Sequence, residues 1–179
     1  AYEIYQCDWS SDVCSSDLWP AAPTVRRAQG RYEEAARFGE KAVAAITKRD
    51  GADSTQLVSP LVVVANNYRD WQRYDLAAET FRRAIALHDK YFGDAHPRTV
   101  TLMEDRASSL LLAGRIDEGL KLWAEVVDLW KFGLGPNHLR EATSRRGYAA
   151  ALRAAGRTAD AAVQEDLAAK VQREWDLGR

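Results

Sequence analysis

The chain has 179 residues, and its 25 Lys and Arg against 26 Asp and Glu give a formal net charge of −1 at pH 7. No apolar run approaches the roughly 20 residues that a membrane-spanning helix needs, so we expect no membrane span. Basic and acidic residues alternate along the chain instead of gathering in one stripe. We therefore expect no nucleic-acid partner, because phosphate binding requires one-sided clustering of cations.

The first 18 residues differ from the rest of the chain. Ala1-Tyr2-Glu3-Ile4 and the run from Asp8 to Leu18 resemble the translation of a short-read sequencing adapter. We therefore exclude residues 1–18 from the fold and expect a non-native, disordered tail. The alternative is a natural tail rich in Ser and Asp. On the first interpretation the native N-terminus is missing, and residues 19–179 form the C-terminal part of a longer protein that ends at its natural C-terminus.

Both cysteines, Cys7 and Cys14, lie in this tail. Residues 19–179 therefore have no thiol that could form a disulfide or bind a metal. The absence of cysteine from residues 19–179 favours a cytoplasmic location.

The sequence from residue 30 onward repeats with a period of 42 residues. Short motifs of similar composition occupy the same phase in four units: Gly30-Arg31-Tyr32, Gln72-Arg73-Tyr74, Gly114-Arg115-Ile116 and Gly156-Arg157-Thr158. A strict period of this length indicates supersecondary units that stack on one another.

Each unit is predicted to contain two antiparallel helices, because apolar residues recur at spacings of three and four. In the second unit these residues are Leu61, Val64, Ala65 and Tyr68, followed after a break by Tyr74, Ala77, Phe81, Ala84 and Ile85. In the third they are Met103, Ala107 and Leu110, then Ile116, Leu120, Trp123, Val127 and Trp130. In the fourth unit, Val163, Leu167, Val171 and Trp175 predict one apolar stripe on a terminal, capping helix.

Glycines separate the predicted helices. Gly114 and Gly156 stand where a helix is expected to end on a left-handed residue. Gln72 replaces that glycine in the second unit, so its turn must be built differently or with strain. Between units, Gly93-Asp94-Ala95-His96-Pro97 ends one helix and starts the next, since Pro97 suits the first turn.

The period, the Gly-x-x-His-Pro linker and the Gly-Arg-Tyr turns together resemble the tetratricopeptide repeat in its longer, kinesin-light-chain-like form. The resemblance implies an all-α, right-handed α-solenoid of stacked antiparallel helix pairs, with about 3.5 repeat units. It predicts units at residues 19–54 (truncated), 55–96, 97–138 and 139–179 (capping).

No catalytic or metal-binding constellation is present in the sequence. The resemblance implies that His96 and His138, at linker positions, are structural, and we expect His88 on a helix rim. None of the three has Cys, Asp or Glu at metal-ligand spacing. We therefore predict no enzyme activity, no metal and no cofactor.

In tetratricopeptide proteins the first helix of each unit lines a concave groove. The 42-residue step predicts a ligand groove formed by eight residues: Val62, Asn66, Arg69, Glu104, Ser108, Leu111, Arg146 and Arg153. The resemblance implies that Asn66 clamps a peptide backbone, since a carboxamide both donates and accepts. Arg146 and Arg153 are candidates for holding a carboxylate. The alternative is that Glu104 and Arg146 neutralise each other across adjacent repeats.

The sequence therefore predicts a protein–protein interaction scaffold that binds a peptide or helix. The resemblance places such modules at the C-terminus of larger bacterial signalling or regulatory proteins. The alternative is a regulatory or oligomerisation arm of a multidomain enzyme, an ATPase or kinase, whose catalytic domain lies outside this chain.

Overall fold

The structure is a computed structural model that describes residues 30–133 and 138–178; the predicted tail, residues 1–18, lies outside them. The described residues form α2 (Tyr32–Asp50), a 3₁₀ turn η1 (Thr55–Leu57), α3 (Val58–Asp70), α4 (Tyr74–Phe92), α5 (Pro97–Leu112), α6 (Ile116–Gly133), α7 (Leu139–Ala154) and α8 (Thr158–Leu177).

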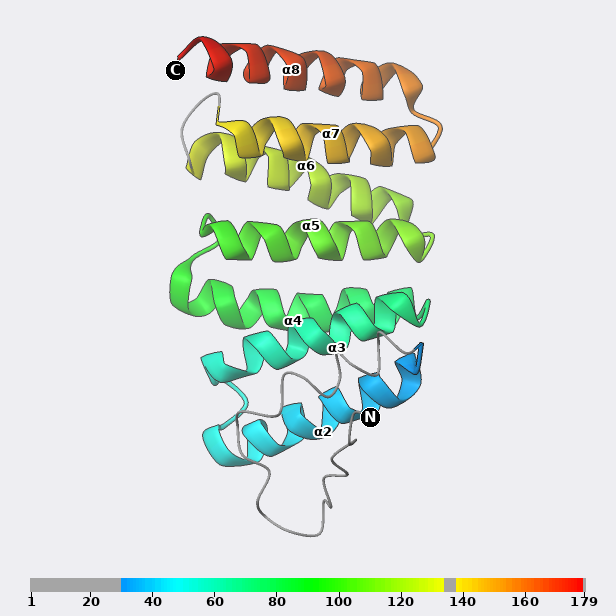
Figure 1. Cartoon of the computed structure of the whole chain (residues 1–179), viewed down its shortest axis with the longest axis vertical. Helices are drawn as coiled ribbons and strands as arrows, with labels where there is room; N and C mark the ends of the chain where they lie inside the picture. Colours follow the sequence, from blue (N-terminus) through cyan, green and yellow to red (C-terminus); the bar gives the residue numbers. More distant parts are fainter. Residues whose placement is uncertain (1–29, 134–137, 179) are drawn as a thin grey trace, which may run out of the picture.

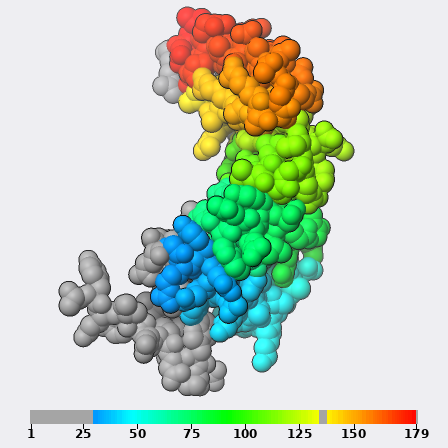
Figure 2. Space-filling model, turned by 90° about the vertical axis from the view of Figure 1, so that its right-hand side faces the viewer, coloured from blue at the N-terminus to red at the C-terminus, as the bar shows by residue number. Residues whose placement is uncertain are grey.

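The helices are stacked in chain order. Consecutive helices run antiparallel, each packs mainly on its two neighbours in sequence, and the stack follows a curved course (Figures 1 and 2). The described residues include no strand, which confirms the predicted all-α solenoid. Within the same ranges, no helix has both the length and the apolar character that crossing a membrane requires.

The predicted apolar face of the second unit is confirmed. Leu61, Val64 and Ala65 of α3 are almost fully buried, and Phe81 of α4 has no exposed surface. Small Ala77 and Ala84, also fully buried, let α4 approach α3 closely. Leu102 of α5 joins this cluster, so it continues into the next unit.

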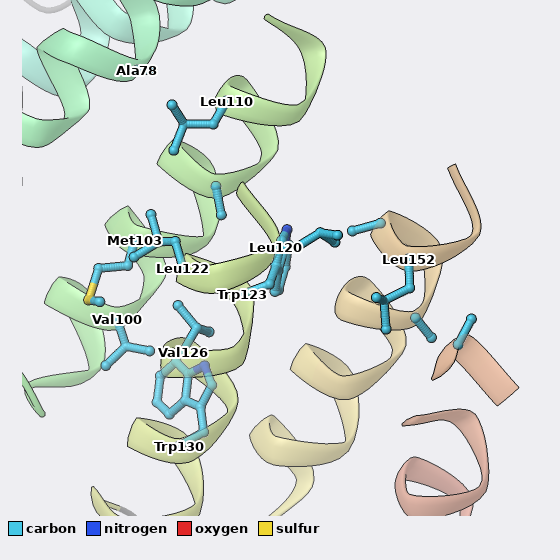
Figure 3. Packing of buried hydrophobic residues seen from close by; sticks show 14 residues of the cluster. Ala78, Val100, Met103, Leu110, Leu120, Leu122, Trp123, Val126, Trp130 and Leu152 are labelled. Carbon is cyan, nitrogen blue, oxygen red and sulfur yellow. The ribbon is translucent and has the colours of Figure 1, made fainter. Parts of the chain in front are cut away.

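The third unit has a second cluster that continues into the fourth. Trp123 of α6 lies between its own helix and the helix that carries Leu152 (Figure 3). Gly147 of α7 makes room for the indole, because a Cβ at that position would lie 2.7 Å from Trp123 Cη2. Leu120, Val127 and Trp130 are buried as predicted, whereas Ile116, at the start of α6, is exposed.

The predicted stripe on α8 is partly wrong. Val163 and Leu167 are exposed, whereas the buried residues are Ala161, Ala168 and Val171. A strict spacing of four drifts by about 40° per step around a helix with 3.6 residues per turn, so the four stripe residues cannot share one narrow face. The face that α8 packs on α7 is instead the one that carries Ala161, Ala168 and Val171, and beside it Arg145 Nη1 of α7 donates to Gln164 Oε1 at 2.8 Å.

The turn within each unit has the same conformation even where glycine is absent. Gly114 and Gly156 have φ of 80° and 77°, and Gln72 has φ of 59°. In each case the following amide closes the turn, as when Arg73 N donates to Tyr68 O at 2.8 Å and Arg115 N to Leu110 O at 2.9 Å. Gln72 therefore adopts a left-handed conformation that costs an L-residue roughly 1–2 kcal/mol.

Two of the linkers between units each carry a histidine that caps the helix that follows. His96 caps α5, because its Nδ1 accepts from Arg98 N at 3.1 Å, and His138 caps α7 in the same way through Arg140 N. This confirms that both are structural. The expectation for His88 was wrong: it is not on a rim but is only 5% exposed, since α4 turns it toward the first turn of α5.

His88 connects α4, the linker and α5. Thr99 Oγ1 donates its one hydrogen to Gly93 O at 2.9 Å, so it accepts from His88 Nδ1, 2.8 Å away. The ring stacks on Phe92 with centroids 4.5 Å apart, and His96 lies 4.9 Å away. Burial lowers the pKa of His88, the charges of His96 and Arg98 lower it further, and Asp89 opposes them.

We predict that Phe81→Ala and Trp123→Ala each lower the free energy of unfolding by about 3–5 kcal/mol, because each leaves a cavity in the core. Denaturant unfolding followed by far-ultraviolet circular dichroism measures the change. Lys121→Ala, an exposed change on α6, is the control and should be nearly neutral. Near-neutral effects at both aromatic positions would contradict the packing described above.

Gln72→Gly should stabilise the chain. The substitution removes a left-handed penalty of roughly 1–2 kcal/mol and adds back about 0.5–1 kcal/mol of backbone entropy cost. We therefore expect the thermal midpoint to rise by about 2–4 °C per kcal/mol gained. The reciprocal change, Gly114→Gln, should lower it; an unchanged or lower midpoint for Gln72→Gly would show that the turn is unstrained.

The buried His88 predicts a loss of stability in acid. Its folded pKa is lowered, so the unfolded state, with a pKa of about 6.5, takes up the proton first. The free energy of unfolding should therefore fall as the pH drops below about 6.5 toward the folded pKa. His88→Asn retains a side-chain donor for Thr99 but does not titrate. The decrease between about pH 7.5 and 5.5 should be smaller in this variant, and an equal decrease would exclude His88 as its source.

Candidate functional site

The eight groove residues predicted from the sequence lie on the three odd-numbered helices. Val62, Asn66 and Arg69 are on α3, Glu104, Ser108 and Leu111 are on α5, and Arg146 and Arg153 are on α7. The α3 and α5 residues are half-buried, whereas the two arginines of α7 are exposed. We call this set, with the side chains that it contacts, the odd-helix face.

Asn66 and Arg69 form one unit with Asp105 of the next repeat. Arg69 Nη2 donates to Asn66 Oδ1 at 2.7 Å, and Arg69 Nη1 donates to Asp105 Oδ1 at 2.9 Å. The Asn66 amide nitrogen has no acceptor among the described residues. The carboxamide is therefore held by its oxygen while its two N–H groups remain available to a ligand. Asp105 could not be predicted from the sequence, because its pairing with Arg69 does not follow the 42-residue step.

Glu104 has a structural role in addition to its position on the face. Its Oε1 accepts a hydrogen bond from Trp130 Nε1 at 2.9 Å and one from the Ser144 hydroxyl. One carboxylate oxygen therefore connects α5, α6 and α7. Ser108 lies one turn further on and donates to the Glu104 main-chain carbonyl at 2.9 Å.

Arg146 is not neutralised by Glu104. Among the described residues its hydrogen-bond partner is Gln172 of α8, at 3.3 Å from Nη2. Arg153 forms an ion pair with Glu165, also of α8. The two arginines thus reach different partners and do not converge on one point; Arg146, with a neutral partner, is the cation of this face that a ligand carboxylate would meet.

The surface of the even-numbered helices carries local ion pairs. Arg82 binds Glu79, Arg115 binds Glu118 and Arg157 binds Asp160, each three residues apart. Exposed pairs of this kind contribute little to stability. They balance each cation with a nearby anion, as the alternation of charges in the sequence predicted.

The described residues contain no group of three or more His, Cys, Asp or Glu placed to hold a metal ion. His88, His96 and His138 are all engaged in the linkers, as described above. The odd-helix face offers hydrogen-bond donors and one weakly engaged cation, and this arrangement is suited to binding.

The comparisons with known proteins agree with this geometry. The family model described as tetratricopeptide repeat matches residues 24–90 and 97–174. A search of curated proteins finds no match.

Solved structures with similar folds include kinesin-light-chain-like proteins. A crystal structure of the Podosopora anserina putative kinesin light chain with nearly identical TPR-like repeats has 20% identity and a TM-score of 0.77, covering 86% of this chain and 73% of that one. BtubC (BKLC) from P. vanneervenii has 13% identity and a TM-score of 0.75, covering 89% of this chain and 64% of that one. These likenesses are to the fold, and the family match identifies the repeats: the chain belongs to the tetratricopeptide repeat family.

Proposed function

We propose that the chain is a protein–protein interaction scaffold that binds a peptide or a helix of a partner on the odd-helix face. The observation that carries the proposal is the Asn66 carboxamide, half-buried and with unpaired N–H groups. Repeat proteins of this kind present extended binding surfaces because each unit adds one more helix to the same layer.

The Asn66 side chain is held in place before any ligand binds. Arg69 fixes its oxygen, and Asp105 fixes Arg69 from the neighbouring repeat. An amide already held in its bound orientation loses little conformational entropy when a peptide carbonyl accepts from it. Asn66 is therefore suited to bind the backbone of a partner. A contact of this kind does not depend on the partner's side chains.

Arg146 extends the same layer toward the C-terminal end of the stack. It is exposed, and its hydrogen bond to the neutral Gln172 is long at 3.3 Å. A carboxylate from a partner would replace this contact with a charge-assisted one, which contributes about 1.5–3 kcal/mol. The preferred partner therefore carries an acidic side chain or a free C-terminal carboxylate.

The proposal extends to the larger protein that would contain this repeat module. We infer that the module serves a larger bacterial signalling or regulatory protein in the cytoplasm. Recovering the reading frame upstream of residue 19 tests this inference. A nucleotide-binding loop or kinase signature there would favour the alternative, an arm of a multidomain enzyme.

We predict that Asn66→Ala and Arg146→Ala each weaken binding of the native partner about ten-fold or more, which corresponds to about 1.4 kcal/mol. The partner is isolated by pull-down with the wild-type chain, and affinities are measured by calorimetric titration. Circular dichroism melts should show nearly unchanged stability, because neither side chain contributes to the core.

Arg37→Ala is the matched control. Arg37 is an exposed arginine on α2, its side chain 71% accessible and paired with Glu33, and it lies outside the odd-helix face. Binding should be unaffected. The proposal fails if Asn66→Ala and Arg146→Ala bind normally while Arg37→Ala or changes at Lys41 and Arg82 abolish binding, since the partner would then occupy the even-numbered helices.

A further inference from the structure

A hollow of about 830 Å³ lies between α2 and α4, with α3 as its floor. The floor is apolar and consists of Leu61, Val64 and the Tyr68 ring of α3, with Val43 of α2 beside them, and each of these residues is no more than 8% exposed. This side of α3 differs from the side that carries Asn66, because Leu61, Val64 and Tyr68 lie across the helical wheel from Asn66, while Arg69 lies between the two sides. The hollow is therefore separate from the odd-helix face.

The hollow is open because its repeat position holds a small residue. Val64 corresponds to Arg106 in the third unit and to Tyr148 in the fourth. Arg106 is partly buried: burial and then the charges of Arg82 and Arg115 lower its pKa, and Glu79 of α4 and Glu118 of α6 oppose them. Tyr148 packs on the second core cluster. The longer side chains occupy the equivalent spaces between those helices, whereas Val64 ends at the floor.

The opposite helix adds no side chain to close the gap. Gly39 of α2 stands where Phe81 and Trp123 stand in the later units. A Cβ at Gly39 would lie 2.3 Å from Val64 Cγ2, so α2 rests directly on Val64. This contact covers most of Val64, and the hollow begins beside it, at Glu40, and follows α2 to Lys48.

The rim of the hollow has an ordered arrangement of charge. On α2 acidic Glu40 precedes basic Lys48, and on α4 acidic Glu79 precedes basic Arg83. Glu40 accepts from the Tyr68 hydroxyl and Glu79 pairs with Arg82, whereas Lys48 and Arg83 have no ion-pair partner among the described residues. The α2 and α4 helices run in the same direction and α3 in the opposite one (Figure 1). The charge along both rims therefore changes from acidic to basic in the same direction.

The backbone of the occupant must satisfy its own hydrogen bonds. The lining consists of helix side chains, and the backbone groups of these helices are bonded within the helices. An extended peptide would therefore place unpaired N–H and C=O groups on an apolar floor, which is costly. A helical segment pairs these groups internally and presents an apolar ridge to the trough.

We propose that the hollow between α2 and α4 binds an amphipathic helix of a partner protein. Its apolar ridge packs over the recessed Val43 and Tyr68 ring and against the exposed methyl groups of Ala44 and Ala86. Acidic residues in its first turns meet Lys48 and Arg83, and basic residues in its last turns meet Glu40 and Glu79. The bound helix thus runs antiparallel to α2 and α4, and its macrodipole opposes theirs.

The test uses three fluorescein-labelled peptides of about 18 residues, long enough to form a helix. The first has a leucine ridge, glutamates in its first turns and lysines in its last. The second has the charges exchanged between its ends, and the third has glutamine in place of leucine. Fluorescence anisotropy with the full chain should give an affinity for the first that is at least about ten-fold higher than for either of the others.

Two substitutions fill the hollow. Val64→Tyr copies the residue at the same position of the fourth unit, and Ala86→Tyr blocks the hollow from its exposed rim without touching the core. Each should weaken binding of the first peptide about ten-fold or more, and Arg83→Glu should weaken it several-fold. Arg173→Glu, the same charge change on the exposed surface of α8, should leave binding unchanged.

The proposal is overturned if the first peptide does not bind or if its binding is the same in Ala86→Tyr as in the wild type. Equal binding of the charge-exchanged peptide would overturn the proposed orientation. Asn66→Ala should bind the first peptide normally. This variant therefore separates failure at the hollow from failure at the odd-helix face.

Discussion

Each helix pair of this chain carries apolar side chains that its own two helices cannot bury. Phe81 of α4 is enclosed by residues of α3 and by Leu102 of the following pair, and Trp123 of α6 reaches Gly147 of α7. Burial of a large aromatic is worth several kcal/mol, and here it is complete only when the next pair is in place. Stability in such a stack therefore depends on the interfaces between neighbouring units.

Polar contacts join helices of neighbouring pairs beside the apolar faces. Arg145 is buried beside Glu141 and donates to Gln164, which faces α7, whereas Val163 is exposed. His88 and Thr99 fix the angle between α4 and α5 in the same manner. Such bonds add little net free energy, but a wrong orientation would leave buried polar groups unpaired.

The positions that differ between units carry the two proposed binding surfaces. The 42-residue frame keeps Ala77 and its equivalents small, whereas the residue at position 64 changes from valine to arginine to tyrosine along the stack. Such positions change both the surface and the contact between neighbouring helices, as the contact of Gly39 with Val64 shows. The scaffold can therefore present donors on the odd-numbered helices and an apolar hollow between the even-numbered ones.

The sequence by itself determined the architecture. The apolar spacing in Leu61, Val64 and Ala65, the recurring glycines and the His96-Pro97 linker specify helices and turns locally, and the strict period requires that they stack. It also identified Gln72 as the exceptional turn residue, because a left-handed position normally needs glycine.

Only the tertiary structure decided which side chains meet. The pairing of Arg69 with Asp105, the engagement of Glu104 with Trp130 and the burial of His88 join residues whose separation does not follow the repeat. The face that α8 buries, with Ala161, Ala168 and Val171, likewise differs from the stripe of large apolar residues in its sequence. Periodicity gives the direction of a side chain on its own helix, but the partner depends on the distance and angle between helices, which packing sets.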